Sequence, residues 1–234
     1  FGYHTNTTNL GLKASIAIHG KKIPIKALIL TEEIFSSEDK ALPKLFDFNR
    51  KGVIYVFDRG IRRGKTYGEI SDSGNYFVSR PTISNYEVVK KNTLPKKCET
   101  ETLVILKDET ISYLRLARRL RRPFRLITAK SKKDKKKFTF ITNLFDEKAT
   151  DITDIYRYRW GIEIFFRFLK QELHLEKLLS YSENGAKVQI YLTLIAFILT
   201  WVYKEQNDIS SFKRAREELR WTLLDKIMEI QFQE

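Results

Sequence analysis

The stretch GVIYVFDRG, residues 52–60, carries the clearest signal of fold class in this sequence of 234 residues. Five consecutive apolar side chains, from Val53 to Phe57, lie between two glycines. Continuous apolar runs of this kind are typical of strands buried on both faces in the centre of an α/β sheet. We therefore predict a central strand that ends at Asp58, where open α/β sheets place their functional side chains. An aspartate after a strand also commonly begins a turn, so position alone leaves both roles open.

Further strands and one helix surround this stretch. Residues 12–30 predict two short strands joined by a turn at HGKK, and residues 75–81 predict another strand that a proline ends. Residues 36–48 begin with a Ser/Ser/Glu capping pattern and place three apolar side chains on one helix face. We assign residues 1–85 to the first part of an α/β core.

The sequence changes character after residue 85. The β-rich segments ETLVILKD, PFRLITAK and FTFITNL alternate with turns, and SKKDKKK between the last two indicates a charged hairpin loop. We assign residues 86–148 to a β-rich insertion. Residues 149–234 show helical spacing, with segments at 155–179, 185–205 and 210–231. The prediction is a mixed sheet flanked by helices, with the insertion ahead of the first long helix.

Composition narrows the class of partner. The chain has 43 Lys and Arg against 29 Asp and Glu, a formal net charge of +14, which favours a polyanion such as nucleic acid. Its one cysteine excludes a disulfide framework and a cysteine-based zinc site. The apolar run 188–203 is slightly shorter than a membrane span of about 20 residues, and we interpret it as a buried helix of a cytoplasmic protein. The first residue is Phe1, not Met, so we expect a processed chain or a fragment.

If residues 155–170, IYRYRWGIEIFFRFLK, form one helix, their polar side chains share a narrow stripe. The stripe consists of Tyr156, Arg159, Glu163, Arg167, Lys170 and, further along, His174. The opposite side is apolar and consists of Tyr158, Ile162, Phe165, Phe168 and Leu169. We expect this apolar back to anchor the helix on the core.

The stripe has two interpretations. A solvated helix face commonly carries i,i+4 ion pairs such as Arg159–Glu163 and Glu163–Arg167. A phosphate-binding site would use the same arginines as bidentate donors, with a lysine as a point charge and a tyrosine hydroxyl on a phosphate oxygen. The rings of Tyr156 and Trp160 beside the charges favour the second interpretation, because a salt-bridged surface does not need them.

Asp58 and Glu163 together suggest two carboxylates that converge on a divalent metal. Mg²⁺ is typically held by few carboxylates plus substrate phosphate, and two such ions support phosphodiester chemistry.

These residues and their spacing resemble a known family. Tyr156-x2-Arg159-x3-Glu163-x6-Lys170 resembles the YREK signature of DDE transposases of the bacterial insertion-sequence-4 family. FITNL before the helix, and DRG followed by YFVSR, resemble family blocks in the family order. The resemblance covers roughly residues 10–200. It implies an RNase H-like (ribonuclease H-like) fold with a β-rich insertion before the glutamate helix.

The resemblance also implies roles. Asp58 would be the second catalytic aspartate and Glu163 the catalytic glutamate, both as ligands of Mg²⁺ or, as a substitute, Mn²⁺. The implied DNA contacts are Tyr156, Arg159 and Lys170, to which we add the neighbouring Arg59 and Arg167. The implied activity is cut-and-paste transposition of double-stranded DNA by a homodimer assembled on paired transposon ends, in the nucleoid.

The chain departs from the family at two points. Before Asp58 it offers only Asp39 and Asp47, both in or beside the predicted helix, so we expect the first catalytic aspartate upstream of Phe1 and predict an inactive fragment. Relatives hold a flipped base with an aromatic side chain of the insertion, and the substitutes here are Tyr113, Phe124, Phe138 and Phe140.

The insertion carries two basic stretches, RLARRLRRPFR at 115–125 and the lysines of 130–137. Lysine runs commonly serve only solubility, whereas arginines interleaved with aromatics favour DNA-backbone binding. The candidate contacts are Arg119, Arg122, Lys133 and Lys136. Two alternatives to a transposase stay open: a catalytically dead, transposase-derived DNA-binding protein, and a different RNase H-like nuclease.

Overall fold

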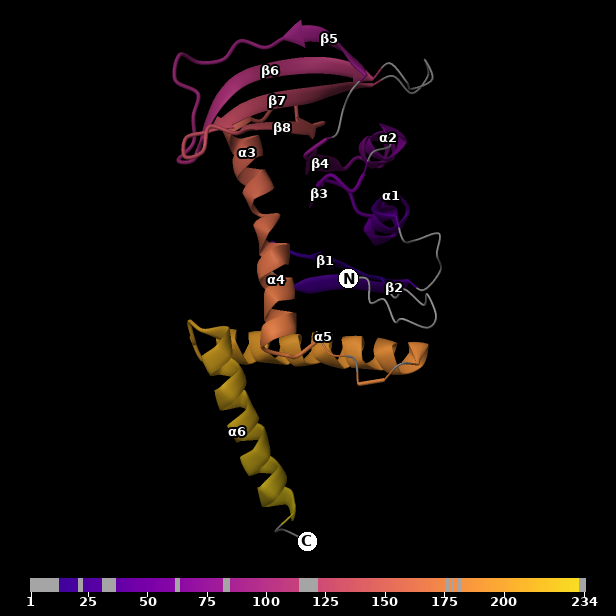
Figure 1. Ribbon diagram of the computed structural model, residues 1–234, viewed down its shortest axis with the longest axis vertical. Coiled ribbons are helices and arrows are strands. Elements are labelled where there is room, and N and C mark those ends of the chain that lie inside the picture. The colour runs from indigo at the N-terminus through magenta and orange to yellow at the C-terminus, as the bar shows by residue number, and fades with distance from the viewer. Residues whose placement is uncertain are drawn as a thin grey trace.

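The computed structural model describes residues 13–20, 23–30, 37–61, 64–81, 85–113, 122–175, 177, 179–180 and 182–231 (Figure 1). The strands are β1 (Lys13–Ile18), β2 (Pro24–Leu30), β3 (Ile54–Phe57), β4 (Tyr76–Ser79), β5 (Tyr86–Lys91), β6 (Leu103–Tyr113), β7 (Pro123–Ser131) and β8 (Lys137–Thr142). The helices are α1 (Glu38–Ala41), the 3₁₀ helix η2 (Leu42–Leu45), α2 (Gly64–Asp72), α3 (Ala149–Arg157), α4 (Trp160–Gln171), α5 (Glu183–Gln206) and α6 (Phe212–Gln231).

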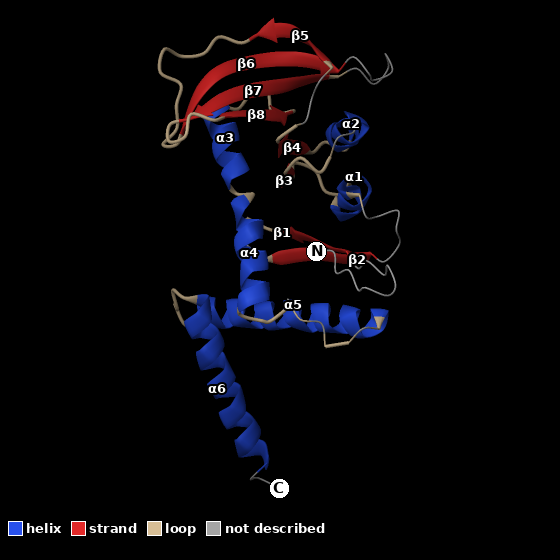
Figure 2. Cartoon of the chain, in the orientation of Figure 1, coloured by secondary structure: helices blue, strands red, loops and turns tan. Residues whose placement is uncertain are grey.

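Six strands form one mixed sheet in the order β3-β4-β8-β7-β6-β5. Strands β3 and β4 are parallel, and every other neighbouring pair is antiparallel. The strands of 86–148 therefore continue the same sheet through the β4–β8 pairing. Figure 2 shows helices on both sides of β3 and β4. The predicted mixed α/β sheet flanked by helices is confirmed.

Alternation along the strands explains the two layers of core. Phe77 of β4 packs with Tyr67 and Ile70 of α2, whereas Val78, next in sequence, packs with Ile152 of α3. Successive side chains point to opposite faces of a strand, so one short strand supplies both clusters. The sheet is thus fixed between α2 and α3, and the carboxyl ends of β3 and β4 lie next to each other.

Strand β3 is not central, which corrects the prediction from its apolar run. Among the described residues it pairs only with β4, at the edge of the six-stranded sheet, and Ile54 is 40% exposed. The expected burial on both faces is also wrong, since only Phe57 of β3 is buried. The apolar run contains no information on how many neighbouring strands share the hydrogen bonds. The hairpin β1–β2 forms a separate two-stranded sheet, in the predicted antiparallel pairing.

The predicted single helix over 155–179 is interrupted once and ends early. A turn at Tyr158 and Arg159 separates α3 from α4, and the backbone there forms i→i−3 hydrogen bonds, such as Gly161 N–H to the Tyr158 carbonyl at 2.9 Å. The tighter turn leaves α3 and α4 stacked end to end (Figure 1). Helix α4 ends at Gln171, so His174, with a φ of 53°, lies beyond the helix and not on its stripe.

The apolar back of α4 agrees with the prediction in its middle and not at its start. Phe165 and Leu169 are buried against Ile190, Leu194 and Phe197 of α5. By contrast, Tyr158 is 68% exposed, because it lies in the turn before α4 begins.

Helix α5 is buried on one face only, which corrects the expectation of a wholly buried helix. Ile190 and Phe197 face the core, whereas Leu192 and Ile195 are exposed. By length and composition α5 is apolar enough to cross a membrane, and about a third of its most apolar window is buried. Core helices of soluble proteins pass the same test.

Candidate functional site

The candidate site lies where β3 ends beside α3 and α4. Asp58 is the first residue after β3, and the Ser79 hydroxyl at the end of β4 donates to its carbonyl at 3.5 Å. Because β3 and β4 are parallel, their carboxyl ends share one edge of the sheet. Asp58 is half exposed there, with its carboxylate directed at α3.

Tyr156 connects the helix to this aspartate. Its hydroxyl donates to Asp58 Oδ1 at 3.0 Å. Its ring packs edge-on against Phe140 of β8, with centroids 5.1 Å apart. Burial, and then the negative charge of Asp58, raise the pKa of the Tyr156 hydroxyl well above its usual range. The hydroxyl therefore stays protonated and acts as a donor at neutral pH.

Arg159 lies between the two carboxylates. Its Nη1 is 2.5 Å from Glu163 Oε1 and 3.9 Å from Asp58 Oδ2. Its guanidinium also lies over the ring of Tyr156, 5.6 Å from the centroid. Burial pushes the pKa of Arg159 down, but the hydrogen bond to Glu163 and the surrounding negative charge outweigh it, so the pKa lies above its ordinary value. Asp58, Tyr156, Arg159 and Glu163 thus form one contiguous cluster, which we call the carboxylate cluster.

The carboxylate cluster fits a divalent metal in its donor chemistry. Glu163 Oε2 is buried and has no hydrogen-bond partner among the described residues. A buried carboxylate oxygen of this kind is what a hard cation satisfies, and Asp58 supplies a second carboxylate across Arg159. No group of three or more His, Cys, Asp or Glu side chains that could hold a metal occurs in the described part of the chain. The fit therefore concerns two protein ligands.

Arg80 is a neighbour of the site that the sequence analysis did not single out. It follows β4 directly, and its guanidinium lies over the ring of Phe138, 5.0 Å from the centroid. Its positive charge also acts on the Tyr156 hydroxyl. The parallel pairing, with Phe57 opposite Ser79, places the residues after the two strands, Asp58 and Arg80, next to each other, and the sequence does not show this pairing.

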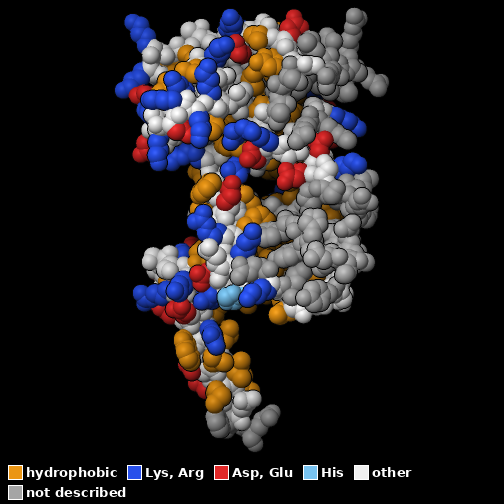
Figure 3. Space-filling model, in the orientation of Figure 1, with side chains coloured by type: hydrophobic (Ala, Val, Ile, Leu, Met, Phe, Trp, Pro, Cys, Tyr) orange, Lys and Arg blue, Asp and Glu red, His pale blue; other side chains and the backbone are white. Residues whose placement is uncertain are grey.

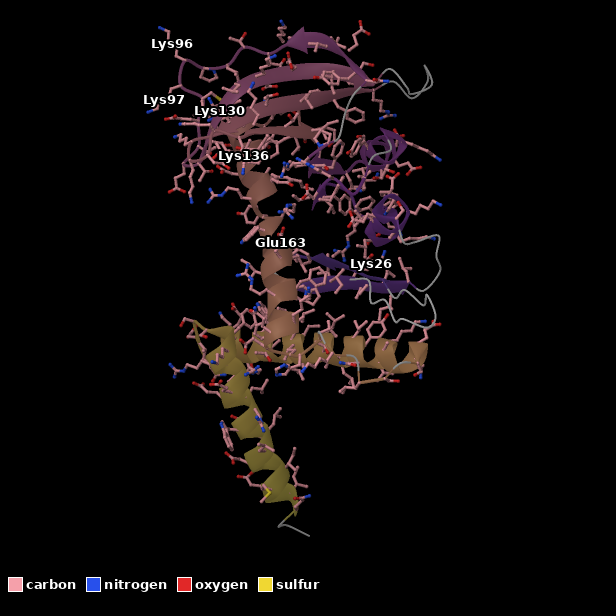
Figure 4. The ribbon with its side chains drawn as sticks, viewed as in Figure 1. Lys26, Lys96, Lys97, Lys130, Lys136 and Glu163 are labelled. Carbon is pink, nitrogen blue, oxygen red and sulfur yellow. The ribbon has the colours of Figure 1, made fainter. Side chains whose placement is uncertain are left out.

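The remaining predicted site residues lie around this cluster to different extents. Arg167 and Lys170 are exposed on α4, beyond Glu163, and Arg59 is exposed in the turn after Asp58. The expected Glu163–Arg167 ion pair is not formed, because Glu163 bonds Arg159 on the preceding turn. Figure 4 shows Glu163 on α4, below the six-stranded sheet.

A second basic region lies at one end of that sheet. The β7–β8 turn carries Lys133 and Lys136, both exposed, which confirms the predicted hairpin loop. Lys96 and Lys97, from the loop between β5 and β6, lie at the same end (Figure 4). On the face drawn in Figure 3, Lys and Arg side chains gather over this end.

Glu99 holds the two loops of this basic region together. Its carboxylate pairs with Lys132 at 3.1 Å and with Lys97 at 3.4 Å. The Lys132 N–H also donates to the Thr102 carbonyl at 2.9 Å. The hydrogen bond from Lys132, together with the pairing to Lys97, lowers the pKa of Glu99. We call the exposed lysines of these loops the basic tip: Lys96, Lys97, Lys133, Lys135 and Lys136.

Of the arginines at 115–125, the structure describes Arg122 and Arg125, and the two have different surroundings. Arg119 lies outside the described residues. Arg122 pairs with Asp72 of α2. Arg125 is buried and bonds Asp108 through Nε at 2.9 Å and through Nη2 at 2.6 Å, so it cannot bind DNA as the basic stretch suggested.

Fewer aromatic side chains of the insertion remain candidates for holding a flipped base. Phe124 and Phe140 are buried in the core, and the side chain of Tyr113 lies outside the described residues. Phe138 is partly exposed and carries Arg80 on its ring. Of the three candidates whose side chains the structure describes, Phe138 is therefore the accessible one.

Comparison with known proteins places this geometry in a family. The family model described as "Transposase DDE domain" matches residues 1–199. A protein of Sinorhizobium fredii named as the transposase y4zB is 29% identical over 164 residues, which are 68% of this chain and 45% of that protein. A protein of Geobacillus stearothermophilus, named as a probable transposase for insertion sequence element IS5377, is 39% identical over 74 residues, 30% of this chain and 20% of its own length.

A third relative, the transposase for insertion sequence element IS421 of Escherichia coli, is 29% identical over 154 residues, 65% of this chain and 38% of its own length. The chain spans less than half the length of each of these curated relatives. No solved structure matches the chain. Because the family model covers most of its residues, including the whole carboxylate cluster, the chain belongs to the transposase DDE domain family.

Proposed function

We propose that this chain is the catalytic core of an insertion-sequence transposase of the insertion-sequence-4 type, with the YREK signature and an RNase H-like fold. The intact protein would cleave phosphodiester bonds at transposon ends and join the freed strands to target DNA. The observation that carries the proposal is the convergence of Asp58 and Glu163, far apart in sequence, on one arginine. In this proposal residues 1–85 and 149–234 are the two parts of the core, and residues 86–148 are the insertion.

Asp58 and Glu163 would hold Mg²⁺, with Mn²⁺ as a substitute. When bound, such an ion activates a hydroxyl nucleophile and stabilises the leaving oxygen. The family resemblance implies a third carboxylate, and no further His, Cys, Asp or Glu side chain joins Asp58 and Glu163 in the described part of the chain. Asp47 does not fit this role, because its carboxylate accepts from the Asn49 N–H at 3.2 Å and pairs with Arg50. We therefore expect little or no strand cleavage by this chain alone.

The side chains of the cluster would position the reacting groups. Tyr156 fixes the orientation of Asp58 by donating to one carboxylate oxygen, and this leaves Oδ2 for another ligand. The half-buried surroundings of Asp58, Arg159 and Glu163 strengthen their electrostatic interactions relative to water. Lys170, Arg167 and Arg59 would bind phosphates of the transposon end, together with Tyr156 and Arg159.

The basic tip would provide a second DNA contact, at a distance from the carboxylate cluster. Lys133 and Lys136 were expected there from the sequence, and the structure brings Lys96 and Lys97 to the same end of the sheet. The five lysines lie on two loops that Glu99 joins, and such a group of lysines can bind the DNA phosphate backbone without base specificity. Arg119 and Arg122 would extend this contact, and Arg122 would have to leave Asp72 to do so.

We further propose that the intact protein works as a homodimer on paired DNA ends, in the cytoplasm and on the nucleoid. A catalytically dead DNA-binding protein derived from a transposase is the second candidate. One observation favours it: Arg159 already neutralises both carboxylates. The two candidates differ in whether the third carboxylate exists in the intact protein.

The deciding experiment uses the full-length protein as its gene encodes it, and a labelled duplex carrying its transposon end. Glu163→Gln or Asp58→Asn should abolish Mg²⁺-dependent cleavage and leave DNA affinity largely intact. Arg167→Gln is the matched control on the same helix: it should weaken DNA binding and still permit cleavage at saturating DNA. If the unaltered intact protein binds the DNA but never cleaves it, the DNA-binding candidate is correct.

A further inference from the structure

The guanidinium of Arg159 cannot bind a DNA phosphate and the two carboxylates of the cluster at the same time. The proposed function assigns it to a DNA phosphate, yet its Nη1 lies 2.5 Å from Glu163 Oε1 and 3.9 Å from Asp58 Oδ2. Its side chain is 18% exposed, and its Nε is buried without a hydrogen-bond partner among the described residues. The guanidinium is therefore committed to the carboxylates and turned away from solvent.

The position of Arg159 between the carboxylates is also the position that a shared cation would take. Glu163 offers Oε1 to Arg159 and keeps Oε2 buried and unpartnered in the described part of the structure. Asp58 offers Oδ2 to Arg159, while Oδ1 is held by Tyr156. A divalent ion held by Glu163 Oε2 and Asp58 Oδ2 would compete with Arg159 for Asp58 Oδ2 and would lie against the positive charge of its guanidinium.

We propose that Arg159 is an internal counter-ion that closes the carboxylate pair, and that it must be displaced before a divalent metal binds there. This inference rests on the proposed function, since it takes Asp58 and Glu163 as metal ligands. Displacement would free the guanidinium for a phosphate oxygen, for which its planar set of donors is well suited. Metal and DNA would then bind cooperatively, and the closed arrangement would keep the site inert without DNA.

The local structure supports a guanidinium that can change partners. Arg159 lies in the turn between α3 and α4, where the backbone makes i→i−3 bonds instead of a regular α-helical ladder. Its guanidinium also lies over the ring of Tyr156, 5.6 Å from the centroid, and this contact is separate from its ion pairs with the carboxylates. Metal and DNA that act on the same side chain are thermodynamically linked, so each must change the affinity of the other by the same factor.

The test measures Mn²⁺ binding to the purified chain without DNA, by the loss of the electron paramagnetic resonance signal of free Mn²⁺. Arg159→Gln should bind Mn²⁺ roughly tenfold more tightly than wild type, within the range of about 5- to 150-fold typical of coupled sites. Arg220→Gln is the matched control, because it removes an equal charge from α6 at an exposed residue with no ion pair among those described. It should change the Mn²⁺ affinity by less than about twofold, since an exposed charge is screened by salt.

Two further variants keep the result interpretable. Arg159→Lys retains the charge and should lie near wild type, which guards against an Arg159→Gln variant that misfolds. Far-ultraviolet circular dichroism checks the fold of each. Asp58→Asn and Glu163→Gln, each in the wild-type background, should weaken Mn²⁺ binding and so show that the carboxylates are the ligands.

A second arm measures cooperativity with a fluorescein-labelled 20-base-pair duplex. Mn²⁺ should raise the DNA affinity of the wild-type chain about tenfold by anisotropy, and less in Arg159→Gln, whose counter-ion is gone. Mn²⁺ binding that depends on both carboxylates but is unchanged by Arg159→Gln would overturn this inference and leave the proposed function standing. Mn²⁺ binding indifferent to Asp58 and Glu163 would overturn both.

Discussion

The hydroxyl of Tyr156 donates a hydrogen bond to Asp58 Oδ1 at 3.0 Å, and this bond joins α3 to the end of β3 across the carboxylate cluster. The ring of Tyr156 is fixed at the same time by Phe140 of β8. A residue from the helical part of the chain is thus held by two strands of the sheet. The bond fixes the orientation of Asp58 before any ligand is bound.

Tyr156→Phe should therefore destabilise the chain modestly. The change removes one partly buried hydrogen bond and keeps the ring, so the loss should be about 0.5–1.5 kcal/mol in the free energy of unfolding. Urea denaturation followed by tryptophan fluorescence measures it. Tyr158→Phe is the control, because Tyr158 is largely exposed two residues away and should leave stability unchanged. Equal effects of the two changes would contradict the role assigned to Tyr156.

Arg125 and Asp108 form a buried ion pair that we expect to be essential to the sheet. Arg125 also donates from Nη1 to the carbonyls of Leu144, Phe145 and Glu147, in the segment that leads into α3. Arg125→Met would leave Asp108 buried beside Asn92 alone, at a cost of about 3–5 kcal/mol. Denaturation midpoints and slopes in urea measure this cost.

Two comparisons test that the cost comes from an uncompensated charge. Arg122→Met removes an arginine whose pair with Asp72 is half exposed, and should cost no more than about 1 kcal/mol. The double variant Arg125→Met with Asp108→Leu should recover part of the stability, because neither charge is then left alone. A double variant as unstable as the sum of the single variants would refute this account.

The sequence predicted the local structure better than the neighbours of each element. Alternating and apolar runs correctly indicated the strands at 54–57 and 76–79 and the hairpin loop at 131–137, since these depend on residues close in sequence. They could not place β3 at the edge of the sheet, because neighbours in a sheet come from distant segments. Arg125 shows the same limit: its charge suggested a surface, and only tertiary packing supplies the buried Asp108.

The sequence predicted which residues form the candidate site, but not all the contacts between them. Helical spacing alone put Tyr156, Arg159 and Glu163 on one stripe, and the structure keeps them together despite the break between α3 and α4. That Arg159 contacts Asp58 as well as Glu163 depends on the end of β3 meeting the helix, which no spacing encodes.

Tyr67 gives a pH dependence that the structure predicts in sign. It is buried, its hydroxyl donates to the Ile61 carbonyl at 3.0 Å, and burial raises its pKa from 10.0 to about 12. Because the folded state holds this proton more tightly, its contribution is complete below pH 10 and is lost as the pH rises through about 12.

The free energy of unfolding should therefore fall between pH 10 and pH 12 by more in wild type than in Tyr67→Phe. Urea denaturation at fixed pH steps measures both, and tyrosinate absorbance at 295 nm follows the ionisation. Parallel profiles for wild type and Tyr67→Phe would show that Tyr67 ionises alike in both states.

The basic tip should contribute to DNA affinity through charge alone, and the salt dependence isolates that contribution. Each phosphate contact on duplex DNA adds about 0.9 to the slope of log K against log salt. Neutralising Lys96, Lys133 and Lys136 together should lower the slope by up to about 2.7, if all three bind phosphates. The matched control neutralises Lys213, Arg220 and Lys226, three exposed cations of α6, and changes the net charge equally. Fluorescence anisotropy with a labelled duplex at four salt concentrations gives both slopes.

A tip variant with an unchanged slope, or a control variant that lowers the slope as much, would show that net charge and not this surface attracts the DNA.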